Sequence, residues 1–275
     1  MAIGRGLEVE AGKNRYYIPL ESIIETLRVP NERIFKYKDK ELIYQGPRPN
    51  FWRAPTDNDS GGDKRSFTHR WQEAGLDKIK IEVVSVKSQQ LNPRLVEVAV
   101  KLQLHAKADK IVYHGIYRIY GNGDIVLNNH FDIGGKLPPV PKIGIKLKIP
   151  QEFDLFNWYG RGPHESYWDR KTGAAVGLYQ GTVADQYFPH IMPQENGNKS
   201  DVRWASLQNK ENVGLLVKGF SQINTSVHHY TVENLTEAKH TYDVENSDYI
   251  TWNVDYQLMG LGGDDSWNPR THEEY

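Results

Sequence analysis

The sequence predicts an all-β fold, organised as one large antiparallel sandwich. Polar and apolar residues alternate with a period of two along most of the 275-residue chain, which is typical of strands with one buried and one solvent-facing side. Glycine and proline, 24 and 14 residues respectively, interrupt this alternation at short intervals, as the turns of an antiparallel sheet require. Helical patterns are few, so a fold built almost wholly from strands is expected.

Eight alternating runs mark the expected strands. In chain order they cover residues 78–86, 94–104, 111–120, 124–131, 142–149, 213–218, 224–229 and 249–256. The dipeptide Asn122-Gly123, followed by Asp124, is a hairpin signal between the third and fourth runs.

Two short segments have helical features. Ser66 is a suitable cap and Gly75 a suitable stop for a helix between them, and residues 232–239 form a weaker candidate. The proline-rich stretch 137–141 is a possible domain boundary, but the strand pattern is alike on both sides of it. A single domain over residues 1–275 is therefore expected.

The composition excludes several classes of function. Basic residues number 34 and acidic residues 35, interspersed without long runs of one sign, which argues against a nucleic-acid or membrane partner. No apolar stretch approaches the ~18 residues needed to span a bilayer. The chain contains no cysteine, so disulfides, thiol chemistry and cysteine-ligated metals are ruled out.

The first dense polar cluster, residues 50–62 (NFWRAPTDNDSGG), begins like a calcium-binding loop at Asp57. The match fails at Gly61, where a calcium loop has an oxygen ligand, and at Thr68, where it has a bidentate glutamate. Local hydrogen bonds that hold a tight turn are favoured over a metal site.

The second cluster, residues 158–170 (WYGRGPHESYWDR), allows two interpretations. His164 and Glu165, beside two tryptophans, could form an acid–base pair in a sugar site. Alternatively, the charged residues form an ion-pair network beneath the loop while the tryptophans enter the core, and this structural interpretation is favoured. The network would contain Arg161, Glu165, Asp169 and Arg170, and the core side chains would be Trp158 and Trp168.

The third cluster, residues 188–197 (FPHIMPQENG), is equally ambiguous, because Glu195 could be a catalyst or a partner for backbone amides. Histidines are scattered without an HExxH pattern, so no zinc site is predicted. A nucleophile elbow and a phosphate-binding glycine loop are both missing from the sequence. Glycoside hydrolysis needs two carboxylates at a set separation, and spacing alone singles out no pair.

The segment 260–269 (GLGGDDSWNP) combines glycines, aspartates and a tryptophan in one turn. The glycines are Gly260, Gly262 and Gly263, and the aspartates are Asp264 and Asp265. The glycines permit backbone conformations that other residues avoid, and the aspartates can accept hydrogen bonds from amides of the turn. Trp267 could then stack on the apolar face of a sugar, or it could fold back into the core.

Four motifs occur in an order that resembles one protein family. They are FWRAPTDND, NWYGRGPHESYWDR, PQENGNKSDVRW and MGLGGDDSWNP, beginning at Phe51, Asn157, Pro193 and Met259. This set resembles the C-terminal domain of lactose-cleaving β-galactosidases of glycoside hydrolase family 2, called domain 5, or the small chain where it is a separate polypeptide. The resemblance extends over nearly the whole chain and implies a β-supersandwich like that of galactose mutarotases.

The resemblance implies that the chain is a non-catalytic part of a larger enzyme. The family's two catalytic glutamates lie in a TIM barrel, of which this chain has no trace, so the isolated chain is expected to be inactive. The implied partners are that barrel and a β-galactoside substrate, in an oligomeric enzyme. No cofactor is expected in this chain, since any Mg²⁺ or Na⁺ would be bound by other domains. A targeting signal would lie there too, which leaves a cytoplasmic or periplasmic location open.

The resemblance also assigns roles to two segments. In the family, the tryptophan of the GGDDSW motif is a platform for the sugar in the leaving-group position, which implies that role for Trp267, with Asp264 and Asp265 shaping the rim. The loop after the DND triplet resembles one that closes when galactose binds. Here that loop, residues 61–66, is shorter and carries different side chains. It begins with Gly61, Gly62, Asp63 and Lys64. The family continues past the GGDDSW motif with another strand, so the chain is expected to lack its last strand.

Two other functions stay open at this point. The chain could be a carbohydrate-binding module with its own affinity for β-galactosides. The shared fold also suggests a mutarotase-like epimerase or a lyase, although a fold alone is weak support. Such an enzyme needs a histidine and a glutamate facing each other in a concave sheet, with His164 and Glu165 or Glu195 as candidates.

Overall fold

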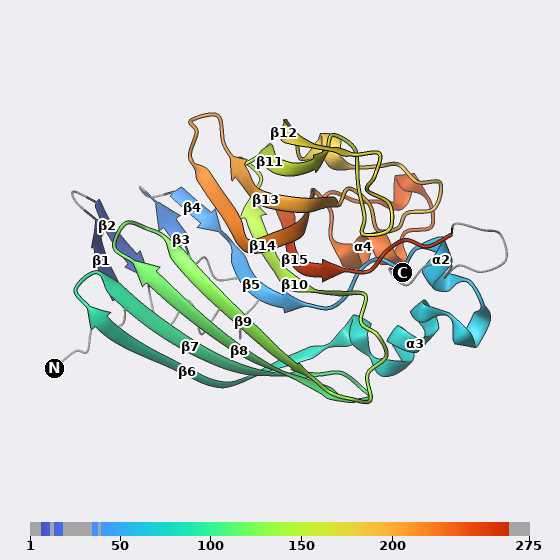
Figure 1. Cartoon of the computed structure of the whole chain (residues 1–275), viewed down its shortest axis with the longest axis horizontal. Helices are drawn as coiled ribbons and strands as arrows, with labels where there is room; N and C mark the ends of the chain where they lie inside the picture. Colours follow the sequence, from blue (N-terminus) through green and yellow to red (C-terminus); the bar gives the residue numbers. More distant parts are fainter. Residues whose placement is uncertain (1–6, 12–13, 19–34, 38–39, 264–275) are drawn as a thin grey trace. The chain divides into compact units, whose positions relative to one another are not determined.

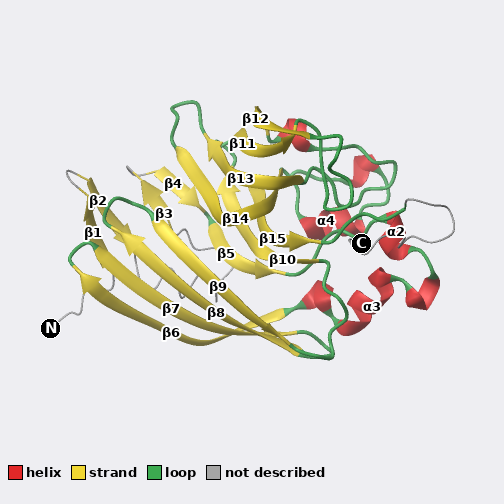
Figure 2. Ribbon diagram, in the orientation of Figure 1, coloured by secondary structure: helices red, strands yellow, loops and turns green. Residues whose placement is uncertain are grey.

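The structure, a computed structural model, describes residues 7–11, 14–18, 35–37 and 40–263. In this part of the chain the paired strands are antiparallel and the helices are short (Figure 1 and Figure 2). The two larger sheets have seven and four strands. The expected all-β, antiparallel fold with few short helices is therefore confirmed.

The contacts within the chain divide it into two compact units. Unit 1 comprises Met1–Gly46 and Glu73–Pro138, and unit 2 comprises Pro47–Gln72 and Pro139–Tyr275. The last boundary between them falls inside the proline-rich stretch 137–141, which the sequence marks as a possible boundary. A single domain over residues 1–275 that lacks its last strand stays a prediction.

Unit 1 is built on a meander of four long strands, drawn in teal to green in Figure 1. These are β6 (Lys80–Asn92), β7 (Leu95–His105), β8 (Lys110–Tyr120) and β9 (Ile125–Ile133), paired in that order. Gly123, with a φ of 94°, turns the β8–β9 hairpin, and Asn122 Nδ2 donates to Asp124 Oδ2 at 2.7 Å. The hairpin signal is confirmed.

The interior of unit 1 follows directly from the alternating sequence. On β7 every second side chain is buried: Val96, Val98, Val100, Leu102 and Leu104. Because successive side chains of a strand point to opposite faces, this row covers one face of the sheet with branched apolar groups. Two antiparallel strand pairs also lie in the described part of unit 1: β1 (Leu7–Ala11) with β2 (Asn14–Ile18), and β3 (Phe35–Tyr37) with β4 (Lys40–Ile43).

Unit 2 contains the seven-stranded sheet, with strand order β12-β11-β13-β14-β15-β10-β5. The strands are β5 (Gln45–Asn50), β10 (Lys142–Pro150), β11 (Leu155–Gly162), β12 (Ala175–Thr182), β13 (Lys199–Gln208), β14 (Gly214–His228) and β15 (Tyr249–Leu258). Strands distant in sequence are therefore neighbours, and the motifs discussed below lie partly on these strands and partly on the connections between them.

The strand predictions were wrong in two respects. Residues 213–218 and 224–229 were predicted as separate strands, but they belong to the single strand β14, whose register with β13 shifts between them. A β-bulge of this kind breaks the alternation without ending the strand. Strands β1 to β5, which precede the first predicted run, and strands β11, β12 and β13 were not predicted. β11 and β13 contain the Tyr-Gly-Arg-Gly and Asp-Val-Arg-Trp stretches of the motifs, whose glycines and charges hide the strand pattern.

Three short helices lie in the described part of the chain: α2 (Asp57–Ser60), α3 (Phe67–Ala74) and α4 (Val232–Glu237). α3 and α4 were predicted. Ser66 Oγ accepts a hydrogen bond from His69 N at 3.1 Å, and Gly75 has a φ of 77°, as the cap and stop of α3 require. None of these helices is long and apolar enough to cross a membrane.

α3 is fixed in unit 2 by its aromatic face. Trp71 is buried, stacks on Phe67 with 5.4 Å between ring centroids, and meets Trp52 edge to face at 6.1 Å. Its indole Nε1 donates to Pro139 O at 2.8 Å. This anchor holds the far end of the connection that begins at α2.

Candidate functional site

The candidate site surrounds the segment 259–263, which follows β15 and which we call the C-terminal segment. Side chains from two other parts of the chain hold its backbone. Arg53 donates to the carbonyls of Met259 (2.8 Å) and Gly260 (2.9 Å), and Asn58 Nδ2 donates to Leu261 O at 2.8 Å. From the other side, Asp169 accepts hydrogen bonds from Leu261 N (3.0 Å) and Gly262 N (2.7 Å), and Arg170 donates to Gly262 O at 3.1 Å. We call Arg53, Asn58, Asp169 and Arg170 the clamp.

Arg53 is oriented by Asp59, and both side chains are completely buried. The guanidinium is bound by both carboxylate oxygens, with Nη2–Oδ1 at 2.7 Å and Nε–Oδ2 at 3.0 Å. Asp59 is held in turn by the capping box of α2, in which Thr56 N donates to Asp59 Oδ2 and Asp59 N donates to Thr56 Oγ1. The helix cap therefore fixes the carboxylate, and the carboxylate fixes the guanidinium that holds the C-terminal segment.

Asp169 lies on a tight turn closed by two backbone hydrogen bonds between Tyr167 and Arg170. The Tyr167 side chain is buried and anchors the turn. A Cβ atom added to Gly260 would lie 2.5 Å from Asp169 Cγ, so only glycine allows the carboxylate this close to the backbone. Gly262 and Gly263 have φ values of 65° and 78°, in the left-handed region that favours glycine.

The Asp57–Asp59 turn makes local hydrogen bonds, as favoured from the sequence. Its side chains also contact residues outside the turn: Asp59 pairs with Arg53, and Asn58 donates a hydrogen bond to Leu261 O. Within the described residues, no group of three or more histidine and acidic side chains is placed to hold a metal ion.

The ion-pair network predicted for residues 158–170 was wrong. Arg161 pairs with Asp201, which also binds Lys171 Nζ at 2.9 Å. Glu165 accepts a hydrogen bond from Gly197 N at 2.7 Å. Asp169 and Arg170 bind the backbone of the C-terminal segment. These side chains therefore connect the second cluster to other segments rather than to one another.

The two tryptophans of the second cluster differ in burial. Trp158 is buried, as predicted, and stacks between Phe156 and Tyr179 at 5.0 and 5.4 Å. Trp168 was predicted in the core, but it is 53% exposed, with Lys171 Nζ 4.5 Å from its ring centroid. It directly precedes Asp169, so its side chain stands in solvent beside the clamp.

The candidate acid–base residues are arranged differently from the prediction. His164 is exposed, and the histidine nearest to Glu165 is His190, whose Nε2 lies 3.6 Å from Glu165 Oε1. Glu195 is buried, and its carboxylate interacts with the charges of Lys142 and Arg53. Burial raises the pKa of the Glu195 carboxyl above its usual value, and the two cations oppose this shift. The backbone-amide partner in this region is Glu165 rather than Glu195.

A buried charge pair lies in the same sheet. Lys142 Nζ is 3.0 Å from Asp255 Oδ2, and each side chain is 1% exposed. Burial disfavours the charge on Lys142, but the carboxylates of Asp255 and Glu195 raise its pKa.

Burial lowers the pKa of Lys199 to about 8 and that of His228 to about 3. No local sequence signal predicts the pairing of Lys142 with Asp255. Arg53, by contrast, stands within the apolar run Phe51-Trp52-Arg53-Ala54, where a charge must find a partner.

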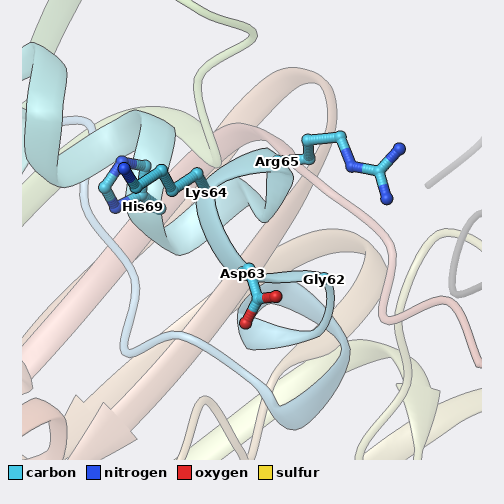
Figure 3. A pocket seen from close by; sticks show the side chains of 5 residues that line it. All are labelled: Gly62, Asp63, Lys64, Arg65 and His69. Carbon is cyan, nitrogen blue, oxygen red and sulfur yellow. The ribbon is translucent and has the colours of Figure 1, made fainter.

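The loop after α2 lines an open pocket of about 620 Å³. Its walls are Gly62, Asp63, Lys64, Arg65 and His69, and the Arg65 side chain points away from those of Lys64 and His69 (Figure 3). Gly62 and Asp63 have φ values of 98° and 54°, and residues 61–65 are exposed. Closure of this loop, with Gly61, Gly62, Asp63 and Lys64, on a bound sugar stays a prediction.

Trp267, Asp264 and Asp265 lie outside the described residues, which end at Gly263. Their roles in binding the sugar stay predictions. The structure shows how the chain immediately before them is held.

Comparison with known proteins identifies the family. Residues 33–275 match the family model of the β-galactosidase small chain. The chain belongs to this family. The resemblance found in the four motifs is thereby confirmed.

Three similar proteins are named β-galactosidases. That of Priestia megaterium is 37% identical over 241 residues, which are 88% of this chain and 23% of the relative. That of Vibrio cholerae is 36% identical over 83% of this chain and 22% of the relative. That of Pseudoalteromonas haloplanktis is 34% identical, over 86% and 23%. The chain thus spans less than a quarter of the length of the relatives it matches.

Proposed function

We propose that the chain is the non-catalytic C-terminal part, or small subunit, of a β-galactosidase, and that it completes the leaving-group side of the active site. The observation that supports this most strongly is the convergence of three family motifs on one backbone segment. Arg53 and Asn58 come from the first motif, Asp169 and Arg170 from the second, and the C-terminal segment opens the last. They hold the chain four residues before Trp267.

The acidic groups of the motifs support a non-catalytic role. Asp59 is paired with a buried arginine, Glu165 accepts a backbone amide, and Asp169 accepts two. Carboxylates that are committed to such contacts are poor candidates for proton donor or nucleophile. We therefore propose that the hydrolytic residues are supplied by the larger part of the enzyme.

An exposed apolar loop supports a protein partner. Phe188, Ile191 and Met192, which we call the apolar loop, project into solvent, and Ile191 is 95% exposed. The loop is nevertheless well held: Phe188 N donates to Asn196 Oδ1, and Gln194 forms hydrogen bonds with Asp57 of α2. Large apolar side chains presented on a fixed loop are typical of a surface that is covered in an assembly. The proposed partner is the catalytic barrel.

The proposed substrate is a terminal β-D-galactoside such as lactose. Trp267 would stack on the sugar in the leaving-group position, since an indole face suits the apolar C–H face of a pyranose. Asp264, Asp265 and the loop at residues 61–66 would shape the rim of the site.

Hydrolysis of a nitrophenyl β-galactoside tests the proposal. The chain alone should be inactive, and activity should appear when the catalytic part of the enzyme is added. Activity in the highly purified chain alone would contradict the proposal, and the carboxylates of Glu165 and Glu195 would then need to be examined by substitution.

The two alternatives have no support from the comparisons, because the relatives are named β-galactosidases. A stand-alone binding module would bind lactose in a titration of the isolated chain, whereas a half-site should bind it barely at all. A mutarotase-like enzyme would change the optical rotation of fresh α-galactose. The His190–Glu165 pair lies on connecting loops rather than on strands of the sheet, which does not favour that chemistry.

A further inference from the structure

The C-terminal segment is intrinsically difficult to fix. Three of its five residues are glycine, and glycine loses more backbone freedom on ordering than any other residue. Gly262 and Gly263 both occupy the left-handed region, so the direction of the chain beyond them depends on two permissive residues. A stacking platform must be placed within roughly half an ångström of its productive position. A tryptophan carried by such a segment therefore needs external support.

The clamp, together with Pro141 directly before β10, supplies that support along the segment. The four carbonyl oxygens from Met259 to Gly262 each accept a hydrogen bond from a clamp residue. The amide of Met259 donates to Pro141 O at 2.8 Å, and those of Leu261 and Gly262 donate to Asp169. Most backbone groups of the segment therefore have a hydrogen-bond partner within the chain itself, without a bound sugar.

Asp169 has a distinct part in this arrangement. It binds two consecutive amides, one with each carboxylate oxygen, and so sets the orientation of the peptide plane between Leu261 and Gly262. That plane lies directly before the two left-handed glycines, where a small rotation changes the direction of everything that follows. Hydrogen bonds to a charged acceptor are also stronger than neutral ones.

Asp169 can be substituted without loss of the fold of unit 2. Arg53 and Asp59 form a fully buried pair, and substitution of either would destabilise the unit. Asp169 is only half-buried, and its turn is closed independently by the backbone hydrogen bonds between Tyr167 and Arg170. Its contact with the segment can therefore be broken separately.

We propose that Asp169 is a positioning residue for sugar binding: by holding the amides of Leu261 and Gly262 it fixes the path of the chain that leads to Trp267. This inference rests on the proposed function, in which Trp267 contacts the leaving-group sugar. Asp169 itself touches no substrate. It acts by keeping the platform in one position, which lowers the ordering cost of binding.

Two substitutions break the same contact by different means. Asp169→Asn keeps the shape but replaces one acceptor oxygen with an amide group, which cannot accept a hydrogen bond from a backbone N–H. Gly260→Ala introduces a Cβ that collides with the Asp169 carboxylate, and the φ of Gly260 lies outside the left-handed region, so alanine is otherwise compatible. The matched control is Asp185→Asn, since Asp185 also accepts a backbone amide, from Thr182 at 2.8 Å, at the end of β12.

The experiment measures KM and kcat for lactose, and the melting temperature, in the complete enzyme that contains this chain. Asp169→Asn and Gly260→Ala should each raise KM roughly three- to tenfold with a small change in melting temperature. Asp185→Asn should leave KM unchanged. In a Trp267→Ala background neither substitution should raise KM further, because the platform that Asp169 positions is already gone.

The outcomes separate this inference from the proposed function. If Trp267→Ala raises KM but Asp169→Asn and Gly260→Ala do not, Asp169 is merely structural and the inference is overturned. If their effects add fully to that of Trp267→Ala, Asp169 acts on something other than the platform, and the inference also fails. If Trp267→Ala itself leaves KM unchanged, the proposed function is overturned as well.

Discussion

The two units of the chain bury very different interiors. In unit 1 the four-stranded sheet buries a regular apolar row, represented by Val98 and Leu102 on β7. In unit 2 the seven-stranded sheet buries charges as well: Lys142 on β10 pairs with Asp255 on β15, and Arg53 pairs with Asp59. Burial of the charges in unit 2 is energetically costly, because each buried ion loses its hydration.

The difference indicates where the fold serves more than its own stability. Hydrophobic residues of similar volume would stabilise unit 2 at least as well as buried ion pairs. Apolar side chains, however, cannot donate hydrogen bonds to backbone carbonyls, as Arg53 does to those of Met259 and Gly260. The buried charge of Arg53 is therefore explained by the backbone segment that it holds, whereas the buried row on β7 is wholly apolar.

The largest expected effect is the loss of one partner of the buried pair. Lys142→Met removes the cation that stabilises the buried Asp255 carboxylate, and should lower the free energy of unfolding by about 3–5 kcal/mol. Urea unfolding measures it. The double variant Lys142→Met with Asp255→Leu should recover much of that loss. If the double variant were as unstable as the single one, the buried pair itself would be essential to stability, and the contrast between the two units would be weakened.

A truncation in unit 1 should cost nearly as much for a different reason. Leu102→Ala creates a cavity in the apolar row and should lower the free energy of unfolding by about 2–5 kcal/mol. Leu91→Ala, on the exposed end of β6, is the control and should change it by less than about 0.5 kcal/mol. Equal effects at the two positions would mean that the apolar row does not carry the stability of unit 1.

The decrease in the free energy of unfolding at acidic pH, the acid limb of the stability curve, should depend on His228 in unit 2. Burial depresses the pKa of His228 to about 3, against 6.5 for the free side chain. Between these values the unfolded chain binds a proton that the folded chain does not, so the free energy of unfolding falls as the pH is lowered, by at most about 1.4 kcal/mol per pH unit. His228→Asn should flatten this limb when unfolding is followed by urea titration between pH 7 and pH 4. An unchanged slope would show that His228 does not cause it.

Substitution in the apolar loop should have the smallest effect on stability. It should nevertheless have a clear effect on assembly with the catalytic part. Ile191→Asp should leave the unfolding of the chain within about 0.5 kcal/mol of its original value and weaken association with the catalytic part roughly tenfold or more. Leu178→Asp, at an exposed position on β12, is the matched control. Sedimentation of the mixed parts measures association. Equal weakening by both variants would argue against a docking role for Ile191.

Much of the fold could be predicted because its causes are local. Alternation along β7 and β8, the turn at Gly123, and the cap and stop of α3 each depend on a few neighbouring residues. Some of the failures came where motif residues or a bulge interrupt the pattern. β11 and β13 contain glycines and charges of the motifs, and a bulge in β14 breaks its alternation.

The sequence motifs located the residues of the site, but they did not predict which residues contact one another. The resemblance marked the motifs that contain Arg53, Asp169 and Gly260, but not their contacts. Arg53 and Gly260 are separated by 207 positions in the chain, and no local rule brings them together. Trp168 was misplaced because a large aromatic side chain is usually buried, whereas here it stands exposed beside the clamp.

The most direct test of the central claim is the substitution Trp267→Ala in the complete enzyme, with KM for lactose and the melting temperature measured on the same preparations. A platform on a fixed segment predicts a marked rise in KM, reduced transfer to sugar acceptors, and a nearly unchanged melting temperature. An unchanged KM with a collapsed melting temperature would show that Trp267 is a core residue, and would contradict the claim that this chain completes the sugar site.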